Sequence, residues 1–340
     1  MSESTMSTLT RPVAPERLAS EQRAEANRRR RWREGRIGWG FFAPFAILFA
    51  LTFVVPILVS IRSSFFTEKA AGDSLYGGGG LVETFAFLDN YAQVLGNAIF
   101  WEGMGRVLLF GAVQIPVMLG GALILALLLD SFIVRRVAFF RLAYFLPYAI
   151  PGVIAALVWT YIFSPGFSPI NQALVALSDA LAALLGSPVD LTIDFFAPGT
   201  IIASMATMTT WTFMGYNMLI FLAALQAIPH DLYEAARLDG ASEFAIVRRI
   251  KVPMVGQATL LAVLLSIIGT VQLFNEPTVL AAVNPWMGND YTPMMLAYSS
   301  MMGTTSPSGA GPASAVSISM ALIAGILAAI FALVQKRSTR

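Results

Sequence analysis

The chain has 340 residues, of which 56% are hydrophobic and only 12% charged, and its formal charge is +2. Soluble domains carry about 25% charged residues, so this composition predicts an integral membrane protein. The absence of cysteine excludes disulfides and thiolate metal sites, and the single histidine, His230, leaves almost nothing for a zinc site or a histidine-based triad. His230 is expected at the aqueous surface.

The N-terminal segment to Arg36 contains nine arginines, with the run ANRRRRWREGR near its end. It is too long for a signal-peptide n-region, and a full apolar span without a small-residue cleavage site follows it. A nucleic-acid patch is disfavoured because no folded reader domain accompanies it. We therefore predict that residues 1–36 form a disordered basic tail on the cytoplasmic side.

Six later stretches each supply the roughly 20 apolar residues that a helix needs to cross a bilayer. Helices are expected because isolated strands leave backbone groups unpaired in lipid. The sequence thus predicts an all-α membrane protein with six transmembrane helices, with Pro116, Pro147 and Pro151 as kinks in the second and third. The predicted spans are Ile37–Ile61, Val107–Leu129, Ala138–Phe163, Thr200–Ile228, Pro253–Val279 and Ala313–Val334.

Two segments between the spans have their own character. Gly77–Gly80 is not a phosphate-binding loop, because no Gly-Lys-Ser/Thr follows it, and a flexible linker is the better interpretation. Asn171–Leu185 has leucines at helical spacing but is too short to span. It predicts a helix that lies on the outer face or packs over the bundle.

The segment between the fourth and fifth spans, EAARLDGASEFAIVRRIKVP, is charged although long apolar runs flank it. Asp231 and Glu234 fit a capping pair for a helix from Leu232 to about Asp239. Gly240 is suited to a left-handed stop, and Ser242 to capping a second helix that ends in basic residues. The segment predicts a helix, a glycine turn and a second short helix.

This helix–turn–helix segment, called the elbow below, is open to three interpretations. In the first it is a docking surface for another protein, with Phe244 and Ile246 as apolar anchors and the basic residues as a rim. Alternatively, it is an interfacial hairpin without a partner. A DNA-reading helix–turn–helix is disfavoured, because Pro253 ties the second helix to a span and the turn carries acidic residues.

The distribution of basic residues predicts the orientation of the spans. Nineteen of the 22 Lys and Arg residues fall in the two termini and the loops after the second and fourth spans. Only Arg62, Lys69 and Arg106 fall on the other side. The positive-inside rule therefore places both termini and the charged elbow in the cytoplasm.

The elbow resembles the signature of binding-protein-dependent ABC importer permeases. Glu-Ala-Ala, Gly240, Ile250 and Pro253 have the spacing of that signature, and Val252 replaces its usual leucine. LDNYAQVL, LPYAIPGVIAALVW and ALQAIPHDLYEAARLDGAS are similar to the maltose/glycerol-phosphate branch of sugar permeases. The resemblance covers about Phe41 to Val334, and the short C-terminus looks like that of the first permease of a pair.

The resemblance implies a permease domain over 37–335, with a coupling loop at 230–253 and short cytoplasmic tails at 1–36 and 336–340. It implies a non-catalytic subunit of a bacterial plasma (inner) membrane importer, with a second permease, two ATPases, an extracytoplasmic substrate-binding protein and membrane lipid as partners, and no nucleic acid. No phosphate loop is present in the sequence, so ATP and Mg would be bound by the ATPases. The implied coupling residues are Glu234, Ala235, Ala236, Asp239, Gly240, Ser242, Phe244, Ile250 and Pro253.

Polar residues inside spans are costly in lipid and usually face the bundle interior. The predicted substrate pathway consists of Thr210, Tyr216, Asn217, Gln272, Asn275 and Glu276, with Gln114, Thr209 and Gln226 as further candidates. Thr210, Tyr216 and Asn275 match the family's sugar site when aligned on Trp211 and Phe274. Glu276 is either a sugar ligand or a wetted carboxylate at the mouth. Asn217 and Gln226 are equally suited to hydrogen bonds between helices.

The function that the resemblance implies is ATP-driven import of a mono- or oligosaccharide. The main alternative is a secondary sugar carrier driven by protons or sodium, which usually needs carboxylates buried within its spans. Asp130 and Glu276 are expected only at span ends. A membrane-bound enzyme is a weaker alternative, because no nucleophile–base or metal constellation is evident. The identity of the sugar does not follow from the sequence.

Overall fold

The computed structural model describes residues 27, 32, 35–70, 81–131 and 134–338. The predicted flexible linker at Gly77–Gly80 lies outside the described residues, as does nearly all of the predicted disordered tail. The chain divides into two compact units, residues 1–60 and 61–340.

The described part of the first unit is one apolar helix. It belongs to a 30-residue candidate span, Gly35–Ser64, which confirms the first predicted span. Residues Ala50–Val54 (η1) are π-helical, and α2 (Val55–Ser64) continues across the boundary between the units. Phe42, Phe45, Phe49 and Phe53 follow one another at ring-centroid distances of 5.3–6.0 Å along one face.

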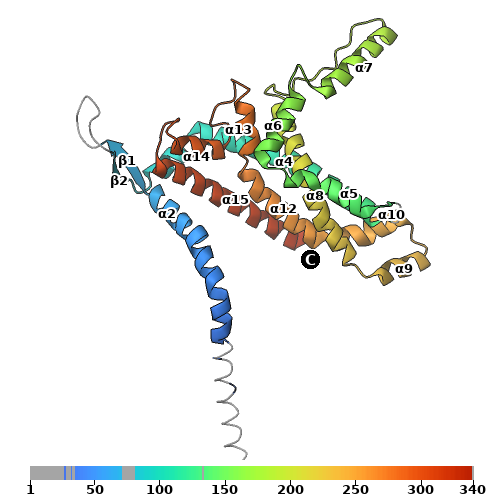
Figure 1. Ribbon diagram of the computed structural model, residues 1–340, viewed down its shortest axis with the longest axis horizontal. Coiled ribbons are helices and arrows are strands. Elements are labelled where there is room, and N and C mark those ends of the chain that lie inside the picture. The colour runs from blue at the N-terminus through green and yellow to red at the C-terminus, as the bar shows by residue number, and fades with distance from the viewer. Residues whose placement is uncertain (1–26, 28–31, 33–34, 71–80, 132–133, 339–340) are drawn as a thin grey trace, which may run out of the picture. The chain divides into compact units, whose positions relative to one another are not determined.

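The described residues of the second unit are mostly helical and include one pair of short strands (Figure 1). Its elements in chain order are β1 (Phe66–Ala70), β2 (Leu81–Phe85), α3 (Asp89–Leu95), α4 (Ala98–Asp130), α5 (Val137–Phe145), the 3-10 turn η2 (Leu146–Ala149), α6 (Gly152–Phe163), α7 (Pro169–Leu185), α8 (Ile201–Gln226), α9 (His230–Leu238), α10 (Glu243–Ile246), the π-helical η3 (Val247–Lys251), α11 (Val252–Met254), α12 (Gly256–Val271), α13 (Asn275–Ala281), α14 (Pro293–Met301) and α15 (Ala310–Ser338).

The sequence did not predict the strand pair. β1 and β2 are antiparallel, with Phe66 opposite Phe85. The Asn90 amide donates to the carbonyls of Ser64 and Phe66, both at 2.8 Å, and so fixes the start of the pair against α3. The strands are too short to contribute to a membrane crossing.

The described residues contain five helical stretches long and apolar enough to span a membrane, and a sixth span if one bent helix pair is included. This confirms the all-α, six-span prediction. The third span differs from the expected kinked helix, because its two parts, 137–149 and 152–163, meet at 97°. Pro151 lacks a backbone donor and holds Ile150 in an extended conformation (φ −79°, ψ 130°). Pro116, by contrast, lies inside the unbroken helix α4.

Two other spans depart from the predicted bounds. The fifth is interrupted: α12 ends at Val271 and α13 begins at Asn275, so residues 272–274 are not helical. The last helix, α15, extends to Ser338, so the predicted tail at 336–340 begins within a helix.

The helix predicted at Asn171–Leu185 is α7, which begins two residues earlier. Ser168 caps it by accepting from the Asn171 backbone N–H at 3.2 Å, and Gly186 ends it with φ +67°. The Asn171 side chain also exchanges hydrogen bonds with the backbone of Ile193 at 2.9 and 3.0 Å. These bonds join α7 to the segment that returns toward α8.

Tight packing of α8 against α4 and α5 forms the centre of the second unit. Met218, Phe221 and Leu222 of α8 are fully buried. Small residues allow this approach: a Cβ on Gly121 would lie 2.7 Å from Met214 Sδ, and one on Gly215 would overlap the Tyr144 carbonyl. Close contact through small residues is typical of helices that pack in membranes.

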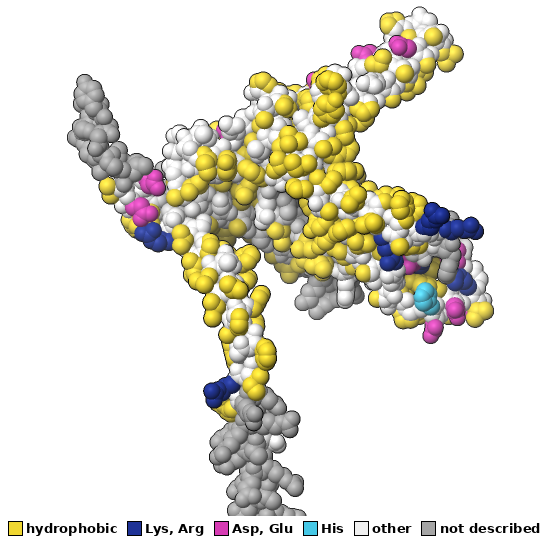
Figure 2. All heavy atoms as spheres, in the orientation of Figure 1, with side chains coloured by type: hydrophobic (Ala, Val, Ile, Leu, Met, Phe, Trp, Pro, Cys, Tyr) yellow, Lys and Arg dark blue, Asp and Glu magenta, His cyan; other side chains and the backbone are white. Residues whose placement is uncertain are grey.

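Charged side chains lie toward the ends of the second unit. In Figure 2, Lys and Arg gather around the end that carries α9 and α10, while most of the surface between the ends is hydrophobic. An apolar band between charged ends is the surface expected of a protein that crosses a bilayer.

Candidate functional site: a polar cavity and a charged elbow

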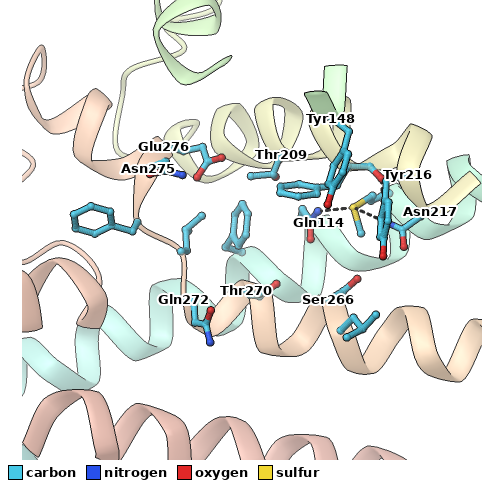
Figure 3. Close-up of a pocket in the computed structure, with 17 residues that line it drawn as sticks. Gln114, Tyr148, Thr209, Tyr216, Asn217, Ser266, Thr270, Gln272, Asn275 and Glu276 are labelled. Atoms are coloured by element: carbon cyan, nitrogen blue, oxygen red, sulfur yellow. Dashed lines mark hydrogen bonds between the residues drawn. The ribbon is translucent and has the colours of Figure 1, made fainter. Parts of the chain in front are cut away.

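A cavity of about 350 Å³ lies among α4, α8, α12 and the interrupted parts of the third and fifth spans. It combines polar and aromatic side chains in an otherwise apolar unit (Figure 3). The lining residues are Phe110, Gln114, Met118, Tyr148, Thr209, Phe213, Tyr216, Asn217, Leu265, Ser266, Gly269, Thr270, Gln272, Leu273, Phe274, Asn275 and Glu276.

Two tyrosines form an aromatic face at one end of the cavity. The rings of Tyr148 and Tyr216 stack with centroids 4.7 Å apart and planes at 17°, and Phe213 meets Tyr148 edge-on at 5.9 Å. Tyr148 reaches the cavity because η2 lies where the third span breaks. A straight third span would carry this ring elsewhere.

Neutral amides and hydroxyls lie beside the tyrosines. Gln114 Nε2 donates to Met118 Sδ at 3.0 Å (Figure 3), and Asn217 Nδ2 donates to the Phe213 carbonyl at 3.0 Å. Ser266 donates to the carbonyl of Ala262, one turn earlier in its helix, at 2.7 Å. The amide oxygens of Gln114 and Asn217 are not used in these bonds, so they can accept hydrogen bonds from a polar ligand.

The other end of the cavity is formed by the break in the fifth span. Asn275 and Glu276 open α13 there, beyond the non-helical residues 272–274. Glu276 is only 8% exposed, which disfavours the interpretation of this residue as a solvent-exposed carboxylate at the mouth of the pathway. It is the only charged side chain that lines the cavity among the described residues.

Five of the six residues predicted for the substrate pathway therefore meet in one cavity: Tyr216, Asn217, Gln272, Asn275 and Glu276. Thr210 does not line it. Its buried hydroxyl has no hydrogen-bond partner among the described residues, and the preceding Thr209 lines the cavity instead. Gln226 is exposed at the end of α8.

The sequence interpretation missed Tyr148, Ser266 and Thr270. The signal available for Tyr148 was its position between Pro147 and Pro151, where a break in the helix exposes a side chain. Ser266 and Thr270 lie four residues apart on the face of α12 that points into the cavity.

The charged elbow begins differently from the prediction. α9 starts at His230, and Pro229 precedes it without any side-chain capping bond, so the predicted Asp231–Glu234 capping pair is wrong. Proline before a helix restricts the backbone and starts the helix early, which places Asp231 inside the first turn. There its negative charge still complements the helix dipole.

The turn of the elbow is as predicted. Gly240 has φ +81°, its N–H donates to the Arg237 carbonyl at 3.0 Å, and the Ala241 N–H donates to the Ala236 carbonyl at 2.9 Å. This pair of bonds is the Schellman motif, which requires a left-handed residue and therefore favours glycine.

The second limb is also capped as predicted. Ser242 Oγ accepts from the Ala245 N–H at 3.3 Å, and α10 continues through η3 and α11 to Met254. Arg237 Nε bonds Glu243 Oε1 at 2.8 Å and links the two limbs. The hydrogen bond from Arg237 lowers the pKa of Glu243.

The exposed surface of the elbow differs from the predicted anchors. Phe244 is 74% exposed, but Ile246 is only 1% exposed and belongs to the core, so Ile246 is not a docking anchor. Leu238, at 90% exposed, was missed and lies across the turn from Phe244. Among the predicted coupling residues, Ala236 and Ile250 pack against the core, and the following are exposed: Glu234, Ala235, Asp239, Gly240, Ser242 and Pro253.

Comparison with known proteins identifies the family. Residues 118–340 match the family described as "Binding-protein-dependent transport system inner membrane component", and the chain belongs to it. The predicted family is therefore confirmed, and the chain is a multi-pass membrane protein of a transport system.

Similar proteins include carbohydrate permeases. The lactose transport system permease protein LacF of Rhizobium radiobacter is 33% identical over 243 residues, which is 70% of this chain and 74% of the relative. The trehalose/maltose transport system permease protein MalF of Thermococcus litoralis is 27% identical over 75% of this chain and 80% of its own. A chain of a bacterial alginate ABC transporter, solved with an alginate pentasaccharide-bound periplasmic protein, superposes with a TM-score of 0.68 at 17% identity, covering 91% of this chain and 98% of that one.

Proposed function

We propose that this chain is one of two permease subunits of an ATP-driven importer for a neutral carbohydrate. The observation that carries the proposal is the cavity, in which stacked Tyr148 and Tyr216 lie beside neutral amides and hydroxyls. Sugars present hydroxyls that need such partners and apolar ring faces that pack on aromatic rings. Relatives named for lactose and for trehalose and maltose support this substrate class.

The charge of the cavity favours a neutral substrate. No Lys, Arg or His lines it in the described part of the chain, and Glu276 is buried there. An acidic sugar would find no cation to pair with among the described residues of this cavity, and Glu276 would repel it whenever that side chain is ionised. The cavity thus suits neutral sugars better than acidic ones.

The elbow is proposed to contact an ATPase subunit. Leu238 and Phe244 are its most exposed large apolar side chains, at 90% and 74%, and they flank in sequence a turn held by backbone hydrogen bonds. Exposed apolar groups on a rigid, polar element are typical of a docking surface. The positive-inside distribution would place this surface, with both termini, in the cytoplasm.

The outer partner is proposed to be a substrate-binding protein. Support comes from the alginate transporter that was solved with its periplasmic protein. The segments 164–199 and 280–312, which contain no Lys or Arg, would face that partner. ATP and Mg would be held by two ATPase subunits, and this chain would be non-catalytic.

The test is uptake by proteoliposomes that contain the purified complex and receive a loaded binding protein from outside. We expect accumulation of a labelled neutral oligosaccharide only with internal ATP, and no effect of ionophores that collapse proton and sodium gradients. Uptake that needs a gradient and ignores ATP would instead show an ion-coupled carrier, for which the buried Glu276 would be the natural ion site.

The substrate charge is tested separately with the chain in detergent. Saturation-transfer NMR compares lactitol and lactobionate, which share a galactose on an open six-carbon chain and differ at its end, where lactitol has CH2OH and lactobionate a carboxylate. We expect a signal from lactitol alone, and a gain of the lactobionate signal in Glu276→Gln. Equal signals from both probes in the unaltered chain would contradict selection for neutral sugars.

A further inference from the structure

A buried ion pair joins the elbow to the end of the second span. Lys251 Nζ of η3 donates to Asp130 Oδ2, the last residue of α4, at 2.6 Å. The two side chains are only 11% and 14% exposed. Lys251 is therefore not part of the exposed basic rim expected from the sequence.

Both limbs of the elbow take part in this contact. Tyr233 of α9 is 6% exposed, and the Lys251 ammonium lies 5.1 Å from the centroid of its ring. Burial, followed by the negative charge of Asp130, raises the pKa of Tyr233. Lys251 thus contacts the end of α4 through Asp130 and the first limb through the ring of Tyr233.

Stability alone is a poor explanation for the pair. A carboxylate at the C-terminal end of a helix is opposed by the helix dipole. Removing two charges from water is costly, and a buried ion pair is often no more stabilising than apolar residues of the same size. Its surroundings, which include Leu129, Ile246 and Val255, are apolar and would accommodate such residues.

α4 continues from this contact to the cavity. Phe110, Gln114 and Met118 of the same helix line the cavity. Asp130 is twelve positions beyond Met118, about 18 Å along a helix that rises 1.5 Å per residue. The helix is continuous over this distance, so a displacement at Asp130 moves the wall that holds Gln114.

We propose that Asp130 and Lys251 are positioning residues through which movement of the elbow is passed along α4 to the cavity. This inference rests on the proposed function. Ion pairs and rigid helices are among the physical connections that carry coupling between distant sites.

The experiment measures ATP hydrolysed per carbohydrate molecule imported by the reconstituted complex. The variants are Asp130→Asn, Lys251→Met and the exchange Asp130→Lys with Lys251→Asp. Glu102→Gln is the matched control, because it removes an ion pair with Arg106 from the other end of the same helix. We expect each single variant to lose about tenfold in uptake while hydrolysis changes far less, within the usual range of coupling effects. The exchange should restore most of the uptake, and the control should match the unaltered complex.

The proposal is overturned if the ATP hydrolysed per carbohydrate molecule imported stays unchanged in both single variants. If hydrolysis and uptake have then fallen in proportion, the ion pair has a merely structural role. Failure of all three charge variants to accumulate in the membrane would overturn it too. Absence of ATP-driven uptake by the unaltered complex would instead count against the proposed function.

A second measurement uses the absence of cysteine from the chain. Asp130→Cys with Lys251→Cys, in a complex whose partners are also free of cysteine, can be bridged by a short bifunctional thiol reagent. If the elbow and α4 move together, the bridged complex should regain the coupling that the unbridged variant loses. Loss of all transport on bridging would show that the two parts move separately, contrary to the proposal.

Discussion

The elbow and the cavity are built by contacts of very different range. In the elbow, Arg237 and Glu243 pair across six positions, and the Gly240 turn closes on Arg237. In the cavity, Asn217 reaches Met118 across 99 positions, and Tyr148 stacks on Tyr216 from another span. The elbow is thus a local structure that its own residues specify, whereas the cavity exists only once the spans have packed.

The largest effect is expected from a substitution that disrupts the helix packing on which the cavity depends. Gly215→Ala would place a Cβ against the Tyr144 carbonyl, where only backbone movement makes room. Overpacking that forces the backbone to shift costs about 1–3 kcal/mol, and a Cβ that overlaps a carbonyl belongs at the upper end of this range. We expect a clear drop in thermal stability in detergent. Gly120→Ala is the control, since nothing lies within 4 Å of its added Cβ, and equal stability of the two variants would refute the packing argument.

The next effect is confined to the elbow. Gly240→Val forces a branched residue into φ +81°, although nothing within 4 Å would contact its Cβ. The backbone strain is about 1–2 kcal/mol or more. We expect normal membrane insertion and loss of ATP-driven uptake. Gly240→Asn should keep substantial uptake, because asparagine tolerates the left-handed conformation. Full uptake by the valine variant would show that transport does not depend on the conformation of the elbow.

A smaller effect is expected from the aromatic face. Tyr148→Ala removes the ring that stacks on Tyr216 at 4.7 Å, and with it part of the apolar face on which a sugar would pack. The KM for uptake should rise up to about tenfold, which corresponds to about 1.4 kcal/mol of lost binding free energy. Tyr148→Phe retains the ring and should remain within about twofold. An unchanged KM in the alanine variant would show that the carbohydrate does not use this face.

The smallest effect is expected at the cap of the second limb. Ser242→Ala removes the acceptor for the Ala245 N–H and should cost about 1 kcal/mol locally. Amide hydrogen exchange in α10 should accelerate, while the cavity amides stay unchanged. Ser242→Asp restores an acceptor and should reverse the change. Faster exchange around the cavity as well would mean that the two regions are less independent than their contacts indicate.

The sequence predicted well what depends on neighbouring residues. Apolar length predicted the spans, Gly240 the turn, and Ser242 the second cap. The error at the start of α9 was also local: the acidic residues at 231 and 234 fit a capping pair, but Pro229 had already set the beginning of the helix. In this segment the fixed backbone of Pro229, and not a side-chain hydrogen bond, coincides with the start of the helix.

What depends on distant contacts was predicted less well. Thr210 was ranked above Thr209, which was named only as a further candidate, although Thr209 lines the cavity and Thr210 does not. One residue along a helix turns the side chain by about 100°. Tyr148 was missed because its place in the cavity requires both a 97° bend and the approach of α8. Neither the angle of a helix bend nor the register of two packed helices can be predicted from one local stretch of sequence.

The break in the third span lies next to the break in the fifth. A Cβ added to Gly152, at the first of these breaks, would lie 2.6 Å from the side-chain nitrogen Nδ2 of Asn275, at the second. Unwound backbone cannot face hydrocarbon, since its unpaired N–H and C=O groups need protein or water around them. Residues 272–274 line the cavity, so we expect water in the cavity to solvate their unpaired backbone groups. The cavity would then remain hydrated when no substrate occupies it.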